Sequence, residues 1–183
     1  MDNSYINDVY EIYGKKFKIL IDKDDISKRV EFIAEQINQD YKDKKPIFLI
    51  VLKGGMFFAS DLLRHIKLDC EIDAIRARSY GKSMKSSGNV LLEMKIEIEN
   101  KDVIIIEDIV DTGLTLKRLI EKLQEMHPAS IETAAFLSKP TQKKYDVRVK
   151  YIGFEIPSAF VIGYGLDYAE KGRHLPSVYS LID

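Results

Sequence analysis

The chain has 183 residues, 45% of them hydrophobic and 31% charged, which is typical of one globular domain with a substantial core. Its formal net charge of -1 gives no electrostatic basis for general nucleic-acid binding, and no apolar run approaches the roughly 18 residues of a membrane span. The single cysteine, Cys70, excludes an internal disulfide and a multi-cysteine metal site, and the N-terminus lacks the apolar core of a signal peptide. We therefore expect a single cytoplasmic domain with no nucleic-acid or membrane partner.

Predicted helices and strands alternate along most of the chain. Apolar residues at helical spacing from Ile26 to Tyr41, behind a cluster of acidic residues that begins at Asp22, predict the first helix. The continuous apolar run 46–52 predicts a strand that is covered on both faces. The elements expected after it are helix 55–66, strands 71–80, 91–98 and 103–110, a helix with Leu116, Leu119, Ile120 and Leu123 on one face, strand 130–137, and shorter strands in 151–157 and 160–168.

This alternation is typical of an α/β fold with a mostly parallel sheet, in which ligands bind beyond the carboxyl ends of the strands. The stretch 102–115, DVIIIEDIVDTGLT, places three acidic residues at such an end, namely Glu107, Asp108 and Asp111. Solvated acidic residues near a helix start are one interpretation, because the helix dipole favours negative charge there. That interpretation would account for a single carboxylate at this place, but it does not account for three together.

A sugar-phosphate site explains the whole stretch better. Small and hydroxyl residues that open a helix present N–H and O–H groups to a phosphate, and Thr112, Gly113 and Thr115 are of this kind. Acidic residues just before them can accept hydrogen bonds from sugar hydroxyls. The pattern therefore indicates a site for a ribose 5-phosphate, and it is not a P-loop, because G-x-x-x-x-G-K-[ST] occurs nowhere in the chain.

The stretch resembles the signature of the type I phosphoribosyltransferase family, an apolar strand with paired acidic residues followed by D-T-G-x-T. The resemblance implies that Glu107 and Asp108 hold the ribose hydroxyls. It assigns the 5′-phosphate to Asp111, Thr112, Gly113, Leu114 and Thr115. Some relatives carry lysine where this chain has Leu114, so any side-chain phosphate contact there is absent while the main-chain cradle is kept.

The segment LKGG, 52–55, resembles the pyrophosphate-binding loop of the purine salvage enzymes of this family. The resemblance assigns pyrophosphate to Lys53, Gly54 and Gly55, and the peptide before this lysine can be cis in the family. Glycines there would let backbone amides approach an anion closely, although a plain strand-to-helix turn is an alternative. Arg173 resembles the arginine that contacts pyrophosphate from the C-terminal segment.

The polar stretch 78–90, RSYGKSMKSSGNV, reads by composition as a hairpin loop. Its Ser79 and Tyr80 match the start of the catalytic loop of the family. The resemblance implies that this loop closes over the reacting groups and excludes water, which competes as a nucleophile for the activated sugar.

Two later motifs resemble the purine site of the family. Lys139 follows the strand 130–137, and by itself it reads as a surface lysine; the resemblance implies that it donates to the exocyclic oxygen of a 6-oxopurine. Phe160 by itself reads as a core aromatic, whereas the resemblance implies that it stacks on the base. The backbone of Val161 would read the edge of the base, and Asp167 would bind Mg²⁺ through its hydration shell.

The resemblance spans roughly residues 15–180 and is to the bacterial hypoxanthine-guanine enzymes of the family. It implies a mostly parallel sheet flanked by helices (core about 18–150) with a small hood lobe (about 1–17 and 151–183). The implied reaction transfers 5-phosphoribosyl from phosphoribosyl pyrophosphate to N9 of hypoxanthine or guanine, giving IMP or GMP plus pyrophosphate. The implied cofactor is Mg²⁺, bound at Glu107, Asp108 and Asp167. The resemblance also implies that Asp111 handles the N7 proton of the purine and that the protein is a homodimer or homotetramer.

Two alternatives stay open at the level of sequence. One is a sibling enzyme that prefers xanthine, which differs from guanine only at the 2-position; adenine is disfavoured because it offers Lys139 no 6-oxo acceptor. The other is an RNA-binding regulator on the same fold, which would need a basic patch. His65, His127, His174 and Cys70 have no partners at catalytic or metal-binding spacing and are not expected in the site.

Overall fold

The computed structural model of the chain describes residues 9–76 and 97–182. Ser79, Tyr80 and most of the strand expected at 91–98 lie outside this part. Within it, the predicted elements 26–41, 46–52, 55–66, 103–110 and 130–137 all appear with boundaries shifted by only a few residues.

Within the described residues, five strands form a parallel sheet in the order β4-β3-β5-β6-β7, which confirms the predicted α/β class. The strands are β3 (Ile47–Leu52), β4 (Glu71–Arg76), β5 (Asp102–Val110), β6 (Ser130–Ser138) and β7 (Tyr151–Glu155). From β3 the chain adds β4 on one side, and it then crosses back to add β5 on the other side, so the strand order reverses between β3 and β5. In open α/β sheets, the crevice at such a reversal is where ligands bind.

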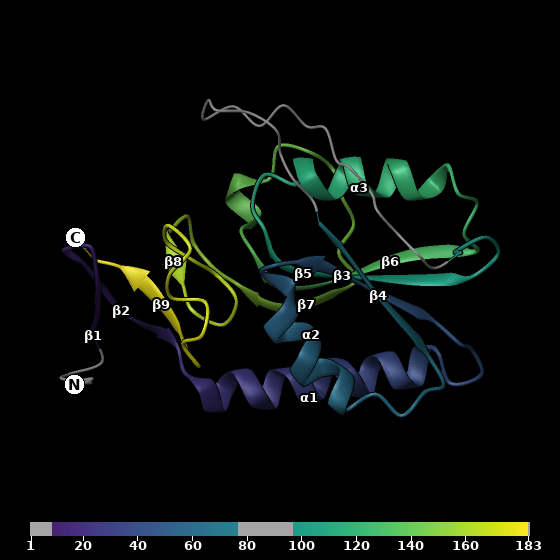
Figure 1. The fold of residues 1–183 in the computed structure, drawn as a ribbon, viewed down its shortest axis with the longest axis horizontal. Coiled ribbons are helices and arrows are strands. Elements are labelled where there is room, and N and C mark those ends of the chain that lie inside the picture. Colours follow the sequence, from purple (N-terminus) through teal and green to yellow (C-terminus); the bar gives the residue numbers. More distant parts are fainter. Residues whose placement is uncertain (1–8, 77–96, 183) are drawn as a thin grey trace.

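Helices cover both faces of this sheet (Figure 1). Helices α1 (Lys23–Asp40) and α2 (Gly55–Arg64) pack on one face, and α3 (Leu114–Gln124) packs on the other. The middle strands are therefore apolar on both sides, as the uninterrupted run of β3 predicted. Helix α1 begins where its sequence indicated, because the Asp22 side chain accepts a hydrogen bond from the Asp24 N–H and caps the helix.

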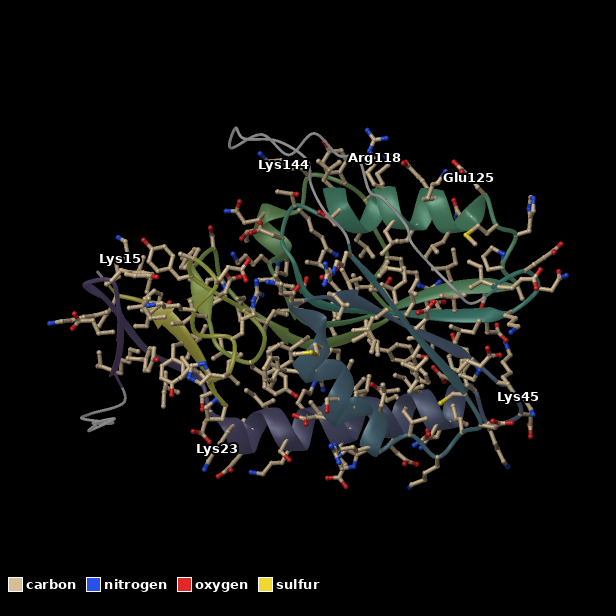
Figure 2. The ribbon with its side chains drawn as sticks, in the orientation of Figure 1. Lys15, Lys23, Lys45, Arg118, Glu125 and Lys144 are labelled. Atoms are coloured by element: carbon tan, nitrogen blue, oxygen red, sulfur yellow. The ribbon has the colours of Figure 1, made fainter. Side chains whose placement is uncertain are left out.

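Helix α3 separates its residues by polarity. Leu116, Leu119 and Leu123 are buried against the sheet, while the side chains of Arg118 and Glu125 point outward into solvent (Figure 2). Packing of this buried face holds the start of the helix next to the carboxyl end of β5. The first turn of α3 is the segment in which the sequence analysis expects the phosphate.

A second, antiparallel sheet forms the hood lobe, in the order β1-β2-β9-β8. Its strands are β1 (Val9–Ile12), β2 (Lys15–Ile21), β8 (Val161–Ile162) and β9 (Val178–Leu181). The N-terminal strands β1 and β2 thus join the C-terminal strand β9 in one sheet, and this segment covers the C-terminal lobe. Strands β1, β2 and β9 were not predicted, because such short strands of mixed polarity carry little periodic signal.

The strand expected over 160–168 is wrong in its length, since only β8 is a regular strand there. Gly163, Tyr164 and Gly165 all have positive φ values, so the chain leaves the strand and folds into tight turns. Tyr164 fastens these turns to the core: its hydroxyl donates to Asp61 Oδ2 of α2 at 2.7 Å, and its ring lies 4.6 Å from that of Phe136 between centroids. Among the described residues, no helix is long and apolar enough to cross a membrane.

Arg29 of α1 binds the outer strand of the sheet. Its guanidinium donates to the carbonyl oxygens of Ile152 and Gly153 in β7, both at 2.7 Å.

Because a lost charge-assisted bond leaves a carbonyl without its partner, we expect Arg29→Met to lower the free energy of unfolding by about 1–3 kcal/mol in urea titrations. The control is Lys28→Met, which removes only an exposed ion pair to Asp25 at 3.9 Å and should change stability by less than about 0.5 kcal/mol. Equal losses for both variants would contradict this role.

Candidate active site

The paired acidic residues lie at the carboxyl end of β5, next to the reversal point of the sheet. Glu107 is only 8% exposed, and Asp108 is partly buried beside it. Burial raises the pKa of Glu107 well above its usual range, and the neighbouring Asp108 charge raises it further. Burial also raises the pKa of Asp108, against opposing hydrogen bonds and the Arg173 charge. Two carboxyls held this closely out of water favour a ligand that brings hydroxyl donors or positive charge.

Residues 107–116, which include these two carboxyls, line a cavity of about 210 Å³. Its floor is the turn that leads into α3, where Gly113 has a φ of +84°. A Cβ at this position would also lie 2.9 Å from Val147 Cγ2, so glycine is required for both conformation and space. The Thr112 carbonyl accepts from the N–H groups of Lys144 and Tyr145 at 3.0 and 3.2 Å, which fixes the turn. The first turn of α3 therefore lines a cavity, as an anion site requires, and the Leu114 N–H donates to Thr112 Oγ1 at 3.4 Å.

The loop 52–55 approaches these carboxyls closely. The Leu52–Lys53 peptide is cis. A Cβ at position 54 would overlap the carboxylate of Asp108, and one at position 55 would lie 2.8 Å from the Ile106 carbonyl oxygen. Both glycines are thus needed to bring the loop against the end of β5. The loop is therefore more than a plain strand-to-helix turn, because it is packed against the acidic end of the neighbouring strand.

Lys139 and Asp111 form an ion pair at the carboxyl ends of β6 and β5. Lys139 Nζ lies 3.1 Å from Asp111 Oδ2, and the Lys139 side chain is only 11% exposed. The interpretation of Lys139 as a surface lysine is therefore wrong. The sheet register explains the pairing, because Val110 pairs with Ser138 and so places the next residue of each strand side by side.

Phe160 and Val161 lie in the hood. Phe160 is 46% exposed, with its ring edge-to-face on Tyr168 at 5.7 Å between centroids. An aromatic ring that is fixed by a neighbour yet open to solvent can stack on a planar ligand, and this exposure contradicts the interpretation of Phe160 as a core residue. Val161 is buried in β8, so only its backbone could contact a ligand from there.

A polar cluster joins the hood to the loop 52–55. Arg173 donates to the Gly165 carbonyl oxygen at 2.7 Å and pairs with Asp167 Oδ1 at 2.7 Å. Lys53 Nζ pairs with Glu170 Oε2 at 2.9 Å. The structure thus brings Lys53, Asp167 and Arg173 together around Glu170. Sequence reasoning missed Glu170, for which no motif gave a signal.

The acidic residues can supply oxygen ligands to Mg²⁺. Among the described residues, no group of three or more His, Cys, Asp or Glu side chains is placed to hold a metal alone. Mg²⁺ commonly keeps several waters and uses one or two carboxylates together with substrate phosphates. The adjacent carboxyls of Glu107 and Asp108, with pKa values raised by burial, fit that kind of site.

Cys70, His65 and His127, which were not expected in the site, have places elsewhere in the fold. Cys70 is partly buried and packs against the core under α1 and α2, and burial raises the pKa of its thiol. His65 ends α2, and its backbone N–H donates to the Leu62 carbonyl oxygen. His127 takes a positive φ in the turn before β6. These roles are structural.

Comparison with known proteins defines the class of protein. The phosphoribosyl transferase domain family matches residues 19–169, so the chain belongs to this family. It is 40% identical over 176 residues to the hypoxanthine-guanine phosphoribosyltransferase of Aquifex aeolicus, covering 94% of this chain and 99% of the relative. It is 40% identical over 164 residues to a hypoxanthine-guanine-xanthine phosphoribosyltransferase of Tritrichomonas foetus, covering 88% and 89%. A crystal structure of a hypoxanthine-guanine phosphoribosyltransferase from Bacillus anthracis superposes with a TM-score of 0.86 at 40% identity, covering 90% of this chain and 98% of that one.

The raised pKa of Glu107 predicts a pH-dependent stability. Because the folded state favours the protonated form, the wild type loses unfolding free energy as the pH rises from the ordinary glutamate pKa of about 4.3 through the raised folded-state value. Glu107→Gln cannot ionise. We therefore expect it to unfold at a higher urea concentration than the wild type at pH 8, with the difference shrinking towards pH 5, in buffers that contain a chelator.

The control for this experiment is Glu31→Gln, which neutralises an exposed glutamate of α1. Its midpoint should follow that of the wild type at both pH values. A Glu107→Gln variant that is no more stable than the wild type at pH 8 would contradict the destabilising charge at this position.

Proposed function

We propose that this phosphoribosyltransferase transfers the 5-phosphoribosyl group of phosphoribosyl pyrophosphate to N9 of hypoxanthine or guanine, forming IMP or GMP and pyrophosphate in purine salvage. The family and the names of the relatives support this reaction. The observation that carries it is the ion pair between the buried Lys139 and Asp111, a residue that lines the cavity at the start of α3. A lysine held there can recognise a 6-oxo group next to a bound ribose phosphate.

We assign the sugar phosphate to the cavity. The N–H groups of Thr112 to Thr115, with the two threonine hydroxyls, would bind the 5′-phosphate, while Glu107 and Asp108 accept from the ribose hydroxyls. Cleavage of the C–O bond at the anomeric carbon builds positive charge on the sugar. The two carboxylates lie where they can stabilise that charge.

We assign the pyrophosphate to Lys53, the amides of Gly54 and Gly55, and Arg173. These groups come from the loop 52–55 and the hood, and Lys53 and Arg173 lie near one another because both pair with Glu170, at 2.9 and 3.6 Å. Phosphoribosyltransferases generally use Mg²⁺ with phosphoribosyl pyrophosphate, and when bound it would neutralise charge on the leaving group. Glu107, Asp108 and, through water, Asp167 are the residues that would hold it.

We assign the purine to the hood and to the end of β6. Phe160 offers an exposed ring for stacking, the Val161 backbone offers hydrogen bonds to the edge of the base, and Lys139 donates to the 6-oxo group. Asp111 would exchange a proton with N7 as N9 attacks the sugar. Its pairing with Lys139 couples recognition of the 6-oxo group to proton transfer on the same base.

The proposal includes the purine specificity, a homo-oligomeric state and a cytoplasmic location, which the family resemblance implies. A panel assay tests the first: the protein is mixed with phosphoribosyl pyrophosphate and Mg²⁺, and nucleotide formation is followed with hypoxanthine, guanine, xanthine, adenine and uracil. We expect turnover with hypoxanthine and guanine and none with adenine or uracil. Turnover with xanthine alone would keep the sugar site and reject the purine assignment, and no turnover with any base would reject the proposed function.

The proposed role of Asp111 predicts an effect on turnover. Positioned proton transfer contributes about 10²–10⁴-fold to a rate, so we expect Asp111→Asn to lower kcat for hypoxanthine by at least about 100-fold. The KM for phosphoribosyl pyrophosphate should change much less. The control is Asp146→Asn, which neutralises an exposed aspartate of the segment after β6 and should leave kcat unchanged. An unaltered kcat in Asp111→Asn would reject the proton-transfer role.

A further inference from the structure

Both cations assigned to pyrophosphate already have carboxylate partners in the free protein. Lys53 Nζ lies 2.9 Å from Glu170 Oε2, and the Arg173 guanidinium lies 2.7 Å from Asp167 Oδ1 and 3.6 Å from Glu170 Oε2. Glu170 therefore contacts both cations. An incoming pyrophosphate would meet positive charges that an internal anion has already neutralised.

The backbone presents Glu170 to these cations in an unusual way. Residues 168–171 form a two-residue hairpin turn, in which Tyr168 and Lys171 exchange backbone hydrogen bonds at 2.9 and 3.1 Å. The two central residues, Ala169 and Glu170, have φ values of +51° and +65°. Such turns favour Gly, Asn or Asp, so a glutamate here is disfavoured by the local conformation. Residues held against their local preference are concentrated at functional sites.

Glu170 is also the carboxylate of the cluster that can move away most easily. Its side chain is 67% exposed, whereas the Asp167 side chain is 26% exposed and also accepts the Glu170 backbone N–H at 2.8 Å. Exposed ion pairs contribute little to stability, since water solvates the separated charges well. The Lys53 ammonium, and to a smaller extent the Arg173 charge, lower the pKa of Glu170, so the carboxylate is charged at neutral pH.

We propose that Glu170 is an internal competitor for the pyrophosphate subsite. Its carboxylate occupies Lys53 and Arg173 when the subsite is empty, and it swings into solvent when pyrophosphate, free or within phosphoribosyl pyrophosphate, binds those cations. Glu170 thereby sets the affinity for pyrophosphate and shortens the time for which the released product stays bound. This inference rests on the proposed function, because it takes the pyrophosphate subsite as given.

A positioning role would have the opposite sign. If Glu170 served to hold Lys53 and Arg173 in place for the ligand, removing its charge would weaken pyrophosphate binding. The direction of the change in affinity therefore separates competition from positioning. The affinity for IMP provides an internal reference, since a nucleotide without pyrophosphate leaves these cations untouched.

The test is calorimetric titration of the full-length protein with Mg²⁺-pyrophosphate and, separately, with IMP. We expect Glu170→Gln to lower the Kd for pyrophosphate about threefold, the order of magnitude of an exposed ion pair, and to leave the Kd for IMP unchanged. The gain should shrink as salt is raised from low to physiological concentration, because salt screens exposed charges. A second variant, Glu170→Asn, removes the same charge with a residue that adopts positive φ more readily, and it should act in the same direction.

The control is Glu125→Gln, which removes an exposed ion pair with Lys122 at 2.6 Å at the end of α3, away from the hood (Figure 2). It should leave both dissociation constants unchanged. If the wild type binds Mg²⁺-pyrophosphate as tightly as both Glu170 variants, or more tightly, the inference is overturned and the proposed function stands. A wild type that does not bind Mg²⁺-pyrophosphate at all would reject the pyrophosphate subsite itself.

Discussion

The site depends on a contact between three backbone segments that only glycine allows. Gly54 lies against the Asp108 carboxylate, and any side chain at position 54 would overlap that carboxylate. Gly165 of the hood lies against Gly54, and a Cβ at position 165 would overlap the Gly54 carbonyl oxygen. The loop 52–55 is therefore held between the end of β5 and the hood. This one constraint brings the proposed pyrophosphate loop close to the carboxyls that we assign to the ribose and to the hood residues that we assign to the base.

Electrostatics gives this junction its chemical character. Among the described residues, carboxyls outnumber ammonium and guanidinium groups around the crevice, and burial makes ionisation of Glu107 and Asp108 costly. The cations are each paired: Lys139 with Asp111, Lys53 with Glu170, and Arg173 with Asp167. Such a site binds an anionic substrate well only when positive charge comes with it and when some of these pairs rearrange. A magnesium complex of a pyrophosphate ester meets the first requirement.

The local signals in the chain were enough to predict the sheet and the centre of the site. The apolar runs of β3 and β5 indicated buried parallel strands, and D-T-G-L-T indicated an anion site at a helix start. Each of these features is encoded within about a dozen neighbouring residues, because strand burial and helix initiation depend on local composition. The same holds for Lys53 and the glycines after it, whose position after β3 follows from the motif.

The sequence by itself thus determined the fold class, the position of the acidic and small-residue motif at the end of β5, and the family. Only the tertiary structure decided that Lys139 is buried against Asp111, that Phe160 is exposed, and that β1 and β2 pair with β9 in one sheet. It also decided the partner of Lys53, which is Glu170, 117 positions along the chain. Contacts of this kind leave no local pattern, because they arise when segments distant in sequence pack together, and the burial and pairing of each charge follow from that packing.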